Sequence, residues 1–517
     1  MDVDSAPAPV EKTYDVCIIG AGPAGLSVLS ALQNPEGILS SEAQWSQWKK
    51  AKEGGSGREL PSVCVIDPAG CWLSEWRGRF RSLGIKMLRS PAWATPDFFS
   101  TNAMCSLHTF AWEAGRQAEL HELELPRKAK HLNRVAGTGM FQLPGSRLFE
   151  DFCDDLVAKL EHTFVPGAAE AVEKRGDGTY DVAVGGHAAP VRAHNVVFAL
   201  GAAGSPTIPA PLSLVHERCA GARNPRVVHT YAWAKLRAAP FKGETVVVIG
   251  GGLSAAQAAL LAVRRGASKV IHVSRRPMLA REYDLPIEWM EPRSGWRLKE
   301  KGGDNGSQKF RSFEFFETPT SERAEWAASA RGGATVPASY LKELERAAKS
   351  GRLERWVDEV VAAEICDCEP QPPASCGCGP NDQGAIRIAF RNGDREILAD
   401  RVVLATGSSL DVSKVPLLSD VAARYELPVE GNLPDIDTDL QWGDESFSVV
   451  GAFALLEVGP DSGNLTGCRR CAEICADKLG AFEAFTQVGG HLQNKYSVFA
   501  ADSSSSSECE SDSDYSD

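Results

Sequence analysis

The chain has 517 residues, of which 43% are hydrophobic and 24% are charged, a composition typical of a folded α/β protein of two or three domains and not of a disordered, fibrous or membrane protein. The formal net charge of −13 argues against nonspecific binding to nucleic acid. Because no apolar run reaches ~18 residues and the N-terminus has neither the basic nor the apolar region of a secretory signal, we expect a cytoplasmic protein that binds no membrane.

The first folded element follows a lead-in, residues 1–13, that we expect to be flexible. The segment TYDVCIIG predicts a buried strand, and an apolar helix pattern, GLSVLSALQ, comes shortly after it. The turn between them, GAGPAG, has the spacing of a loop that holds the pyrophosphate of a dinucleotide at a helix N-terminus. A tight turn without a ligand is the alternative. The expected cofactor-binding residues of this turn are Gly20, Gly22, Pro23, Ala24 and Gly25.

Asp67 ends the next predicted strand, SVCVID, where a carboxylate accepts hydrogen bonds from the hydroxyl groups of an adenosine ribose. It comes later than the usual ~20 residues after the glycine turn. A polar stretch from Asn34 to Leu60 accounts for the delay, and we interpret it as a surface insertion. Asp67 and the glycine turn together predict a dinucleotide site.

A second strand, glycine turn and helix begin at Thr245 with TVVVIGGGLSAAQAALLAVRRG, in which alanine is an accepted third residue of the glycine motif. The next predicted strand, KVIHV, is followed by two arginines and no acidic residue. Guanidinium groups at this place favour the 2′-phosphate of NADPH over the hydroxyl of NADH, whereas a solvated basic turn is the alternative. The expected residues of the second site are Gly250, Gly252, Ser254, Ala255, Arg275 and Arg276.

A third motif, DRVVLATG, runs from Asp400 to Gly407. Together with the two glycine turns, it resembles the two-dinucleotide flavoproteins, and among them the class B flavin monooxygenases and the lysine and ornithine N-hydroxylases. The fragment DPAGCW, from Asp67 to Trp72, is similar to the segment after the ribose-binding acid in flavin monooxygenases. The resemblance covers most of residues 14–480. It implies that FAD and NADPH are the cofactors, with Trp72 and Gly407 among the cofactor-binding residues.

The last predicted helix follows Gly463. By resemblance to the fold, its N-terminus points at the flavin pyrimidine, where negative charge develops on reduction and is stabilised by the helix dipole. Asn464 and Leu465 are its expected contacts with the flavin.

The sequence also departs from the families that it resembles. N-hydroxylases usually continue the ATG motif with tyrosine, and here Ser408 follows it. The segment from His229 to Tyr231 matches the histidine-centred fingerprint of flavin monooxygenases only loosely, and the full Baeyer–Villiger pattern is missing. Two segments, LRSPA and QLPGSRLFEDFC, are similar to segments of a subgroup of N-hydroxylase relatives.

The resemblance implies an α/β fold of two Rossmann-like, doubly wound domains, with the NADPH domain inserted in the FAD domain. Few apolar residues and many acids and serines predict a disordered C-terminal tail. The expected divisions are residues 14–239 for the first part of the FAD domain, 240–399 for the NAD(P)H domain, 400–496 for the C-terminal part of the FAD domain and 497–517 for the tail.

The implied function is that of a monooxygenase acting on a small-molecule substrate. NADPH would reduce FAD, molecular oxygen would react with the reduced flavin, and a flavin hydroperoxide would transfer one oxygen atom to a nitrogen or sulfur atom. No side chain is assigned as catalytic, because the cofactor carries the chemistry. An NADPH-dependent flavin reductase or oxidase without oxygen insertion, or a flavoprotein regulator, are the alternatives, and the oligomeric state stays open.

Two groups of cysteines have spacings that invite a redox or metal role. Cys468, Cys471 and Cys475 fall on one face of the last predicted helix, where we expect them to be buried packing residues and not redox partners. A second group lies in an expected loop and has the four thiols that a structural zinc ion needs, although exposed free thiols are the favoured interpretation. The second group consists of Cys366, Cys368, Cys376 and Cys378.

Overall fold

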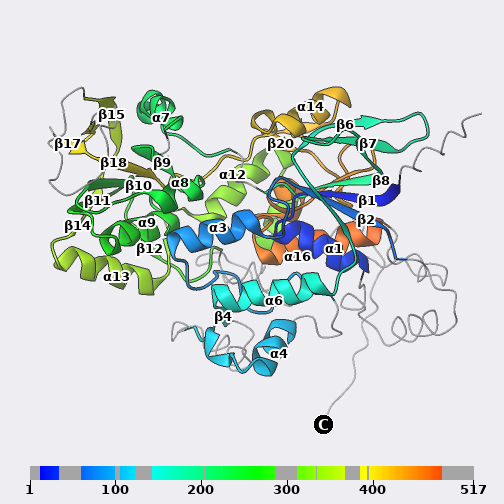
Figure 1. The fold of residues 1–517 in the computed structure, drawn as a ribbon, viewed down its shortest axis with the longest axis horizontal. Helices are drawn as coiled ribbons and strands as arrows, with labels where there is room; N and C mark the ends of the chain where they lie inside the picture. Colours follow the sequence, from blue (N-terminus) through cyan, green and yellow to red (C-terminus); the bar gives the residue numbers. More distant parts are fainter. Residues whose placement is uncertain are drawn as a thin grey trace, which may run out of the picture.

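The computed structural model describes residues 12–33, 60–98, 105–123, 142–201, 205–222, 224–285, 311–333, 335–366, 385–392 and 395–479. Three segments named in the sequence analysis lie outside these residues, wholly or nearly so. They are the lead-in, the polar insertion and the C-terminal tail. Within them, the chain forms two α/β halves, each built on its own sheet, as the sequence predicts (Figure 1). None of the helices in these ranges is long and apolar enough to cross a membrane.

The first half contains a seven-stranded sheet. Its strands are β1 (Thr13–Ile19), β2 (Val63–Asp67), β5 (Thr163–Pro166), β6 (Ala169–Lys174), β7 (Tyr180–Val184), β8 (Val191–Phe198) and β21 (Phe447–Val449). Strands β5, β2, β1, β8 and β21 are parallel in that order. The antiparallel pair β7 and β6 extends the sheet from the first half of β8, because β21 pairs only with its second half, where Val196 is aligned with Phe447.

Apolar helices cover this sheet, which explains why its central strands are continuous apolar runs and do not alternate. Helices α1 (Pro23–Gln33) and α16 (Leu465–Lys478) pack against each other below the sheet in Figure 1, and every residue of α1 after Pro23 is buried. The other helices of this half are α3 (Ser74–Leu83), α4 (Ser106–Glu113), α6 (Ser146–Ala158), α14 (Pro416–Arg424) and α15 (Leu455–Val458).

Short elements join these helices and strands. The hairpins pair β3 (Leu120–His121) with β4 (Leu143–Pro144) and β19 (Val429–Glu430) with β20 (Leu433–Pro434). The single helical turns are η3 (Gln117–Glu119), η5 (Val412–Lys414) and η6 (Gly451–Ala454).

The second half contains a five-stranded sheet. Its strands are β9 (Val227–His229), β10 (Thr245–Ile249), β11 (Lys269–Ser274), β14 (Leu353–Val357) and β18 (Arg401–Leu404). They are all parallel, in the order β14-β11-β10-β18-β9. The helices around it are α7 (Ser213–Ala220), α8 (Trp233–Ala238), α9 (Leu253–Arg264) and α13 (Ala338–Lys349), with the turn η4 (Ala210–Leu212).

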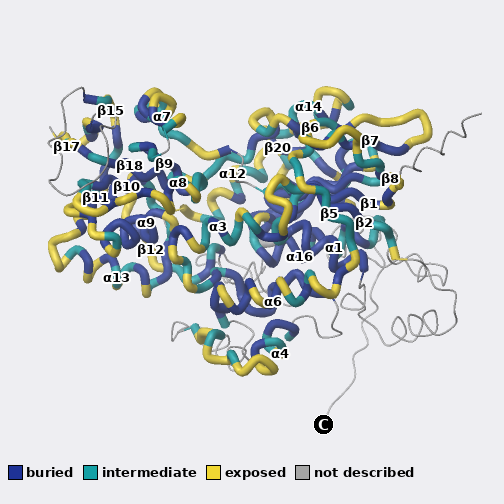
Figure 2. Tube along the Cα trace, viewed as in Figure 1, coloured by how far each residue is buried: buried dark blue, intermediate teal, exposed yellow. Residues whose placement is uncertain are grey.

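An antiparallel sheet adds to this second half. It consists of β15 (Val360–Ile365), β16 (Ile386–Phe390) and β17 (Glu396–Ala399). Its inward side chains share an apolar core with β10, β11 and β18. In Figure 2 the central strands of both halves are buried, and exposed residues lie on the outer faces of the helices, on edge strands such as β15 and β17 and in the turn between β6 and β7.

The sheets divide the chain at other residues than the sequence analysis predicted. Strand β9 ends at His229, before the expected start of the inserted domain at residue 240, and it is the edge strand of the second sheet. Strand β18 begins after the expected end of that domain at residue 399, yet it lies between β10 and β9. The inserted domain is therefore wider at both ends, because strand pairing assigns each strand to a sheet, and local apolar patterns do not report pairing.

The two links between the halves lie side by side. The first link contains Ser205 to Thr207 and the second contains Gly407 to Ser409. The amide of Thr207 donates to the carbonyl of Gly407 at 2.9 Å, and the amide of Ser409 donates to the carbonyl of Ser205 at 3.0 Å. The links therefore form a short antiparallel ribbon.

A third connection between the halves is a segment that leaves the second half after β12 (Leu279–Ala280), packs against the first half and returns at β13 (Thr335–Val336). We call this segment the excursion. It includes α11 (Arg311–Glu317) and α12 (Thr320–Arg331), and it is framed by the two-stranded parallel pair β12 and β13. Phe315 and Ala327 are fully buried in the apolar core of the first half. Arg323 fixes the excursion there by donating from Nη1 to the carbonyl of Leu456 at 2.9 Å.

Candidate functional site

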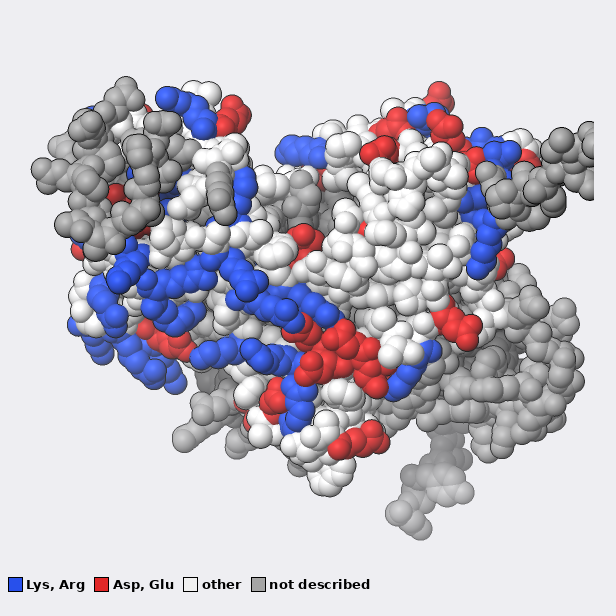
Figure 3. Space-filling view, in the orientation of Figure 1, with Lys and Arg blue, Asp and Glu red and all other residues white. Residues whose placement is uncertain are grey.

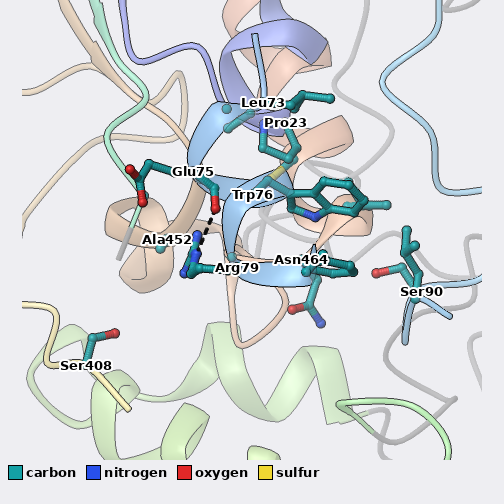
Figure 4. A pocket seen from close by; sticks show the side chains of 18 of the residues that line it. Pro23, Leu73, Glu75, Trp76, Arg79, Ser90, Ser408, Ala452 and Asn464 are labelled. Carbon is teal, nitrogen blue, oxygen red and sulfur yellow. Dashed lines mark hydrogen bonds between the residues drawn. The ribbon is translucent and has the colours of Figure 1, made fainter. Parts of the chain in front are cut away.

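A cavity of about 600 Å³ lies between the two halves. Residues at the carboxyl ends of β1, β2, β8 and β21 line it from the first sheet, and residues following β9, β10 and β18 line it from the second. Ligands of open α/β sheets bind at such strand ends. Side chains from α3, α9 and the N-terminus of α16 complete the wall, and Figure 4 shows several of them around the opening.

The first glycine loop, Gly20–Gly25, leaves β1 and enters α1 with the geometry that its sequence predicts. Gly20 has a φ of +113°, and a Cβ there would lie 2.5 Å from the carbonyl oxygen of Ala199. Only glycine fits this turn. Gly22 lines the cavity, and a Cβ at this position would meet no atom within 4 Å. The backbone thus leaves open space where a pyrophosphate would approach the N-terminus of α1.

The carboxylate of Asp67 belongs to the same wall. Its Oδ2 accepts from the amide of Ala21 at 3.0 Å, and its Oδ1 accepts from the amide of Ala69 at 2.9 Å. Each carboxylate oxygen has a second lone pair, and Asp67 lines the cavity. Asp67 therefore both fixes the glycine loop and keeps acceptor capacity for ribose hydroxyl groups.

The N-terminus of α16 forms the opposite part of the first half's wall. Asn464 and Leu465 both line the cavity, as the sequence analysis expects of flavin contacts. The Nδ2 atom of Asn464 is buried without a hydrogen-bond partner among the described residues. An amide donor at the start of a helix of 14 residues provides a site for partial negative charge.

The second glycine loop, Gly250–Ala255, repeats this design in the other half. Gly250 has a φ of +150°, and a Cβ there would lie 2.2 Å from the carbonyl oxygen of Ala405. His272, which the sequence analysis did not single out, lies 2.8 Å from the carbonyl oxygen of Gly250 through Nε2. Burial lowers the pKa of His272 to about 4, so the neutral ring donates this hydrogen bond at neutral pH and fixes the loop.

Only part of the expected second site reaches the cavity wall. Ser254 lines it, whereas the other five expected residues do not. Arg275 and Arg276 are exposed and directly follow β11, the place at which the sequence analysis puts them. The residues outside the wall are Gly250, Gly252, Ala255, Arg275 and Arg276.

Three residues expected at the first site lie elsewhere. The Nε1 atom of Trp72 donates to Nε2 of His162 at 3.0 Å, and its ring packs edge-on against Phe164, away from the cavity wall. Gly25 packs α1 against β1, since a Cβ there would lie 2.2 Å from the carbonyl oxygen of Gly20. Gly407 belongs to the link between the halves.

The wall includes several side chains that the sequence analysis did not name as site residues. Trp76 stacks on Phe80 with ring centroids 3.9 Å apart, and both belong to α3. Trp76, Arg79 and Phe80 have the i, i+3, i+4 spacing of residues on one face of a helix, and this spacing could have identified them as candidate site residues. The residues of the wall that were not predicted as site residues include Trp76, Arg79, Tyr231, Gln257 and Ser408.

Tyr231 and Ser408 meet where the second sheet faces the cavity. The phenol oxygen of Tyr231 lies 3.1 Å from Oγ of Ser408. Behind them, Nδ1 of His229 accepts from the amide of Tyr231 at 3.2 Å, and burial lowers the pKa of this histidine to about 4. The loose histidine motif therefore has a structural role, in which a neutral ring positions Tyr231.

The cysteines of α16 are buried free thiols, as expected. Burial raises the pKa of Cys471 to about 12 and that of Cys475 to about 11, which leaves them protonated and unreactive at neutral pH. Of the possible zinc ligands, Cys366 is buried at the end of β15, while Cys368, Cys376 and Cys378 lie outside the described residues. Within the described ranges, His, Cys, Asp and Glu side chains form no group that could hold a metal ion.

No protein-family model matches the chain, and no curated protein matches its sequence. Solved structures do share its fold. DfoA from Erwinia amylovora, a cadaverine monooxygenase whose structure contains FAD, has a TM-score of 0.62 and 16% identity, covering 92% of this chain and 96% of DfoA.

Two ornithine hydroxylases share the fold to the same degree. The ornithine N-hydroxylase KtzI from Kutzneria sp. 744, in complex with reduced FAD, NADP⁺ and L-ornithine, has a TM-score of 0.62 and 17% identity over 90% of this chain and 99% of KtzI. PvdA from Pseudomonas aeruginosa has a TM-score of 0.61 and 18% identity over 90% of this chain and 99% of PvdA. The two Rossmann-like halves of this chain are thus those of a known two-domain fold.

Proposed function

We propose that this chain, which has the two-domain fold of these flavin-dependent monooxygenases, is itself an FAD- and NADPH-dependent monooxygenase that oxygenates a nitrogen or sulfur atom of a small substrate. The observation that carries the proposal is that a single cavity is lined by the first glycine loop, by the N-terminus of α16 and by the start of α9. Two dinucleotides bound at these places would meet inside it.

The first half fits FAD. We propose that the space beside Gly22 takes the pyrophosphate and that the acceptor oxygens of Asp67 bind the ribose. The amide of Asn464, which has no partner among the described residues, would contact the flavin ring. When bound, FAD supplies hydride acceptance and oxygen activation. The protein binds and orients the cofactor, so its own residues need no nucleophile.

The second half fits NADPH. A Cβ at Gly252 would meet no atom within 4 Å, which leaves room for a pyrophosphate at the start of α9. The proposed contacts of the 2′-phosphate are Arg275 and Arg276, which follow the end of β11. In Figure 3 basic side chains gather over α8, α9 and α13 of this half, and a surface of this sign attracts an anionic coenzyme although the whole chain is acidic.

The cavity walls also support transfer of oxygen to a substrate. Apolar residues of α3 and of the strand ends line the cavity, and they would limit the access of water to a bound flavin. We propose that Ser90 and Arg331 face the space left for the substrate, since both line the cavity and Arg331 donates to the carbonyl of Pro460 beside the start of α16. The ten described cysteines are free, which supports a reducing compartment, and we propose the cytoplasm.

The test is stopped-flow absorbance of the FAD-loaded protein. NADPH should bleach the flavin, and mixing with oxygen should then give a long-lived species that differs from both reduced and oxidised flavin. Ornithine or cadaverine, the amines of the neighbours, should speed its decay if either is the substrate, with hydroxylated amine formed in place of hydrogen peroxide. Immediate reoxidation with peroxide release would identify an oxidase, and absence of reduction by NADPH would remove the enzymatic proposal altogether.

A further inference from the structure

We propose that Arg79, a residue of the first half, binds the pyrophosphate of the nicotinamide dinucleotide that the second half holds. The inference rests on the proposed function, because it concerns the coenzyme of that site. It assigns a binding residue that lies outside both glycine motifs and outside the inserted domain.

The position of Arg79 carries the first step. It lies on α3, which packs against α8 and α9 of the other half, and its side chain lines the cavity. Its guanidinium carbon is 5.1 Å from the ring centroid of Tyr231, across the boundary between the halves. Figure 4 shows Arg79 extending from α3, with Ser408 on the wall that the second half contributes.

The hydrogen bonding of Arg79 leaves most of its donors for a ligand. Its Nε donates to the carbonyl of Glu75 at 3.3 Å, and among the described residues it forms no ion pair. The carboxylate of Glu75 instead accepts from Nε1 of Trp233 at 3.1 Å, which holds it toward α8. The four N–H groups on the Nη atoms therefore remain, and a guanidinium fork suits the paired oxygens of a phosphate.

The other two arginines of the cavity wall are engaged differently. Arg89 is partly buried, pairs with Asp284 at 2.7 Å and donates to backbone carbonyls, including that of Glu282 at 2.9 Å. Arg331 donates to the carbonyl of Pro460 at 2.8 Å beside the start of α16, at the flavin end. Arg79 is thus the arginine of the described wall that faces the second half with its donors uncommitted.

The start of α9 supplies the second observation. Gln257 lines the same cavity and is 1% exposed, its Nε2 lies 3.3 Å from the phenol oxygen of Tyr340, and its Oε1 has no partner among the described residues. The two ends of an amide are assigned and not observed. With the amide reversed, Oε1 accepts from Tyr340 and Nε2 is a buried donor that supports the cavity wall. Arg79 and the first amides of α9 then approach one anionic group from the two halves, with Gln257 behind them.

The pyrophosphate is the group that fits this place. The adenosine end of the coenzyme belongs at the end of β11, where Arg275 lies, and the nicotinamide belongs at the flavin. The chain between them passes the start of α9 and then Tyr231, which is where Arg79 lies. Both NADP⁺ and NAD⁺ carry this pyrophosphate, so Arg79 should not distinguish them.

The experiment measures binding to the FAD-loaded protein by calorimetry with three probes, NADP⁺, NAD⁺ and adenosine 2′-monophosphate. Replacing Arg79 by Gln should weaken NADP⁺ and NAD⁺ by the same factor, about tenfold to a hundredfold for a charge-assisted hydrogen bond. Adenosine 2′-monophosphate has no pyrophosphate, so its affinity and the flavin content should stay unchanged. Arg79→Lys should recover part of the loss.

The matched control is Arg81→Gln, which removes one positive charge from the same helix at an exposed position paired with Glu150. It should leave all three affinities unchanged. Wild-type protein that binds neither NADP⁺ nor NAD⁺ would overturn the proposed function itself. Unchanged affinities in Arg79→Gln would overturn only the role of Arg79, a loss confined to NADP⁺ would transfer Arg79 to the 2′-phosphate, and an equal loss of adenosine 2′-monophosphate would give it a structural role.

Discussion

Gly22 lines the cavity, and an added Cβ would point into space that holds no protein atom. Gly22→Val should therefore fold but lose FAD, because the branched side chain fills the place of the pyrophosphate. The absorbance of bound flavin relative to protein measures the effect. Gly176→Val is the control, since that glycine also has open space around it but lies in the turn after β6, far from the cavity wall. Stoichiometric flavin in Gly22→Val would contradict the FAD site.

Arg275 and Arg276 determine the choice of coenzyme if either one binds the 2′-phosphate. Losing such a charge-assisted pair costs about 1.5 to 3 kcal/mol, or roughly tenfold to a hundredfold in specificity for NADPH, and the double alanine variant should lose the preference. Flavin reduction rates against coenzyme concentration provide the measurement. NADH should be used as before, because it has no phosphate there.

Equal losses with both coenzymes would instead indicate that Arg275 and Arg276 support the fold or the pyrophosphate. Unchanged rates with both would leave the solvated basic turn as the explanation. The expected loss for Arg275 and Arg276 affects NADPH alone, whereas the expected loss for Arg79 affects NADP⁺ and NAD⁺ equally. The two sets of variants therefore test different parts of the same coenzyme.

At the scale of elements, the contact between α3 and α8 depends on a missing side chain. A Cβ at Gly78 would lie 2.3 Å from the ring of Trp233. Gly78→Ala should force the helices apart and cost about 1 to 3 kcal/mol, the usual range for overpacking. The measurement is the midpoint of thermal unfolding together with the rate of flavin reduction by NADPH. Trp233→Leu in the same chain should recover part of the loss, and additive losses would contradict the contact as its cause.

The contact between α12 and α15 should depend on pH. Burial raises the pKa of Glu457 from its ordinary 4.5 to about 7, and Arg323, 3.4 Å away, lowers it only in part. The folded state then holds the proton more tightly than the unfolded state does. The stability from this group is present below pH 4.5 and is lost as the pH rises through about 7, at about 1.4 kcal/mol per unit of pKa shift.

Glu457→Gln removes this titration. The thermal midpoint of the variant should match that of the wild type near pH 5 and exceed it near pH 8, because the uncharged amide has no cost of ionisation in the buried site. The measurement is thermal unfolding of both proteins across this pH range. A variant that is less stable at pH 8 would show that the attraction to Arg323 outweighs burial.

The elements show what the sequence could predict. Both glycine loops were predictable because the turn, the φ of Gly20 and Gly250 and the helix that follows are local properties. The places of β9 and β18 were not, since a strand of three or four residues carries no pattern that identifies its partners. Trp72 was misplaced for a similar reason. A left-handed Leu73, with a φ of +59°, begins α3 directly after it, and Trp76 reaches the cavity wall instead.

Across the whole molecule, the halves differ in surface charge more than the net value suggests. Basic side chains gather over the half with the five-stranded sheet and over the neighbouring helix α3, and acidic ones gather over α6 (Figure 3). Six of the acids in the net charge come after Ala501, outside the described residues. The net charge argues against nonspecific binding to nucleic acid, but only the structure shows a basic face on the half proposed for NADPH.

The two paired links restrict how the halves can move relative to each other. Two independent linkers allow one body to swivel, but links joined at Thr207 and Ser409 by backbone hydrogen bonds resist twisting against each other. A bend across the ribbon would keep the two dinucleotide sites facing each other. It would have to separate α3 from α8 and α9 and to release α12, which is buried in the core of the first half through Ala327. A coenzyme could thus enter and leave while its alignment with the flavin is preserved.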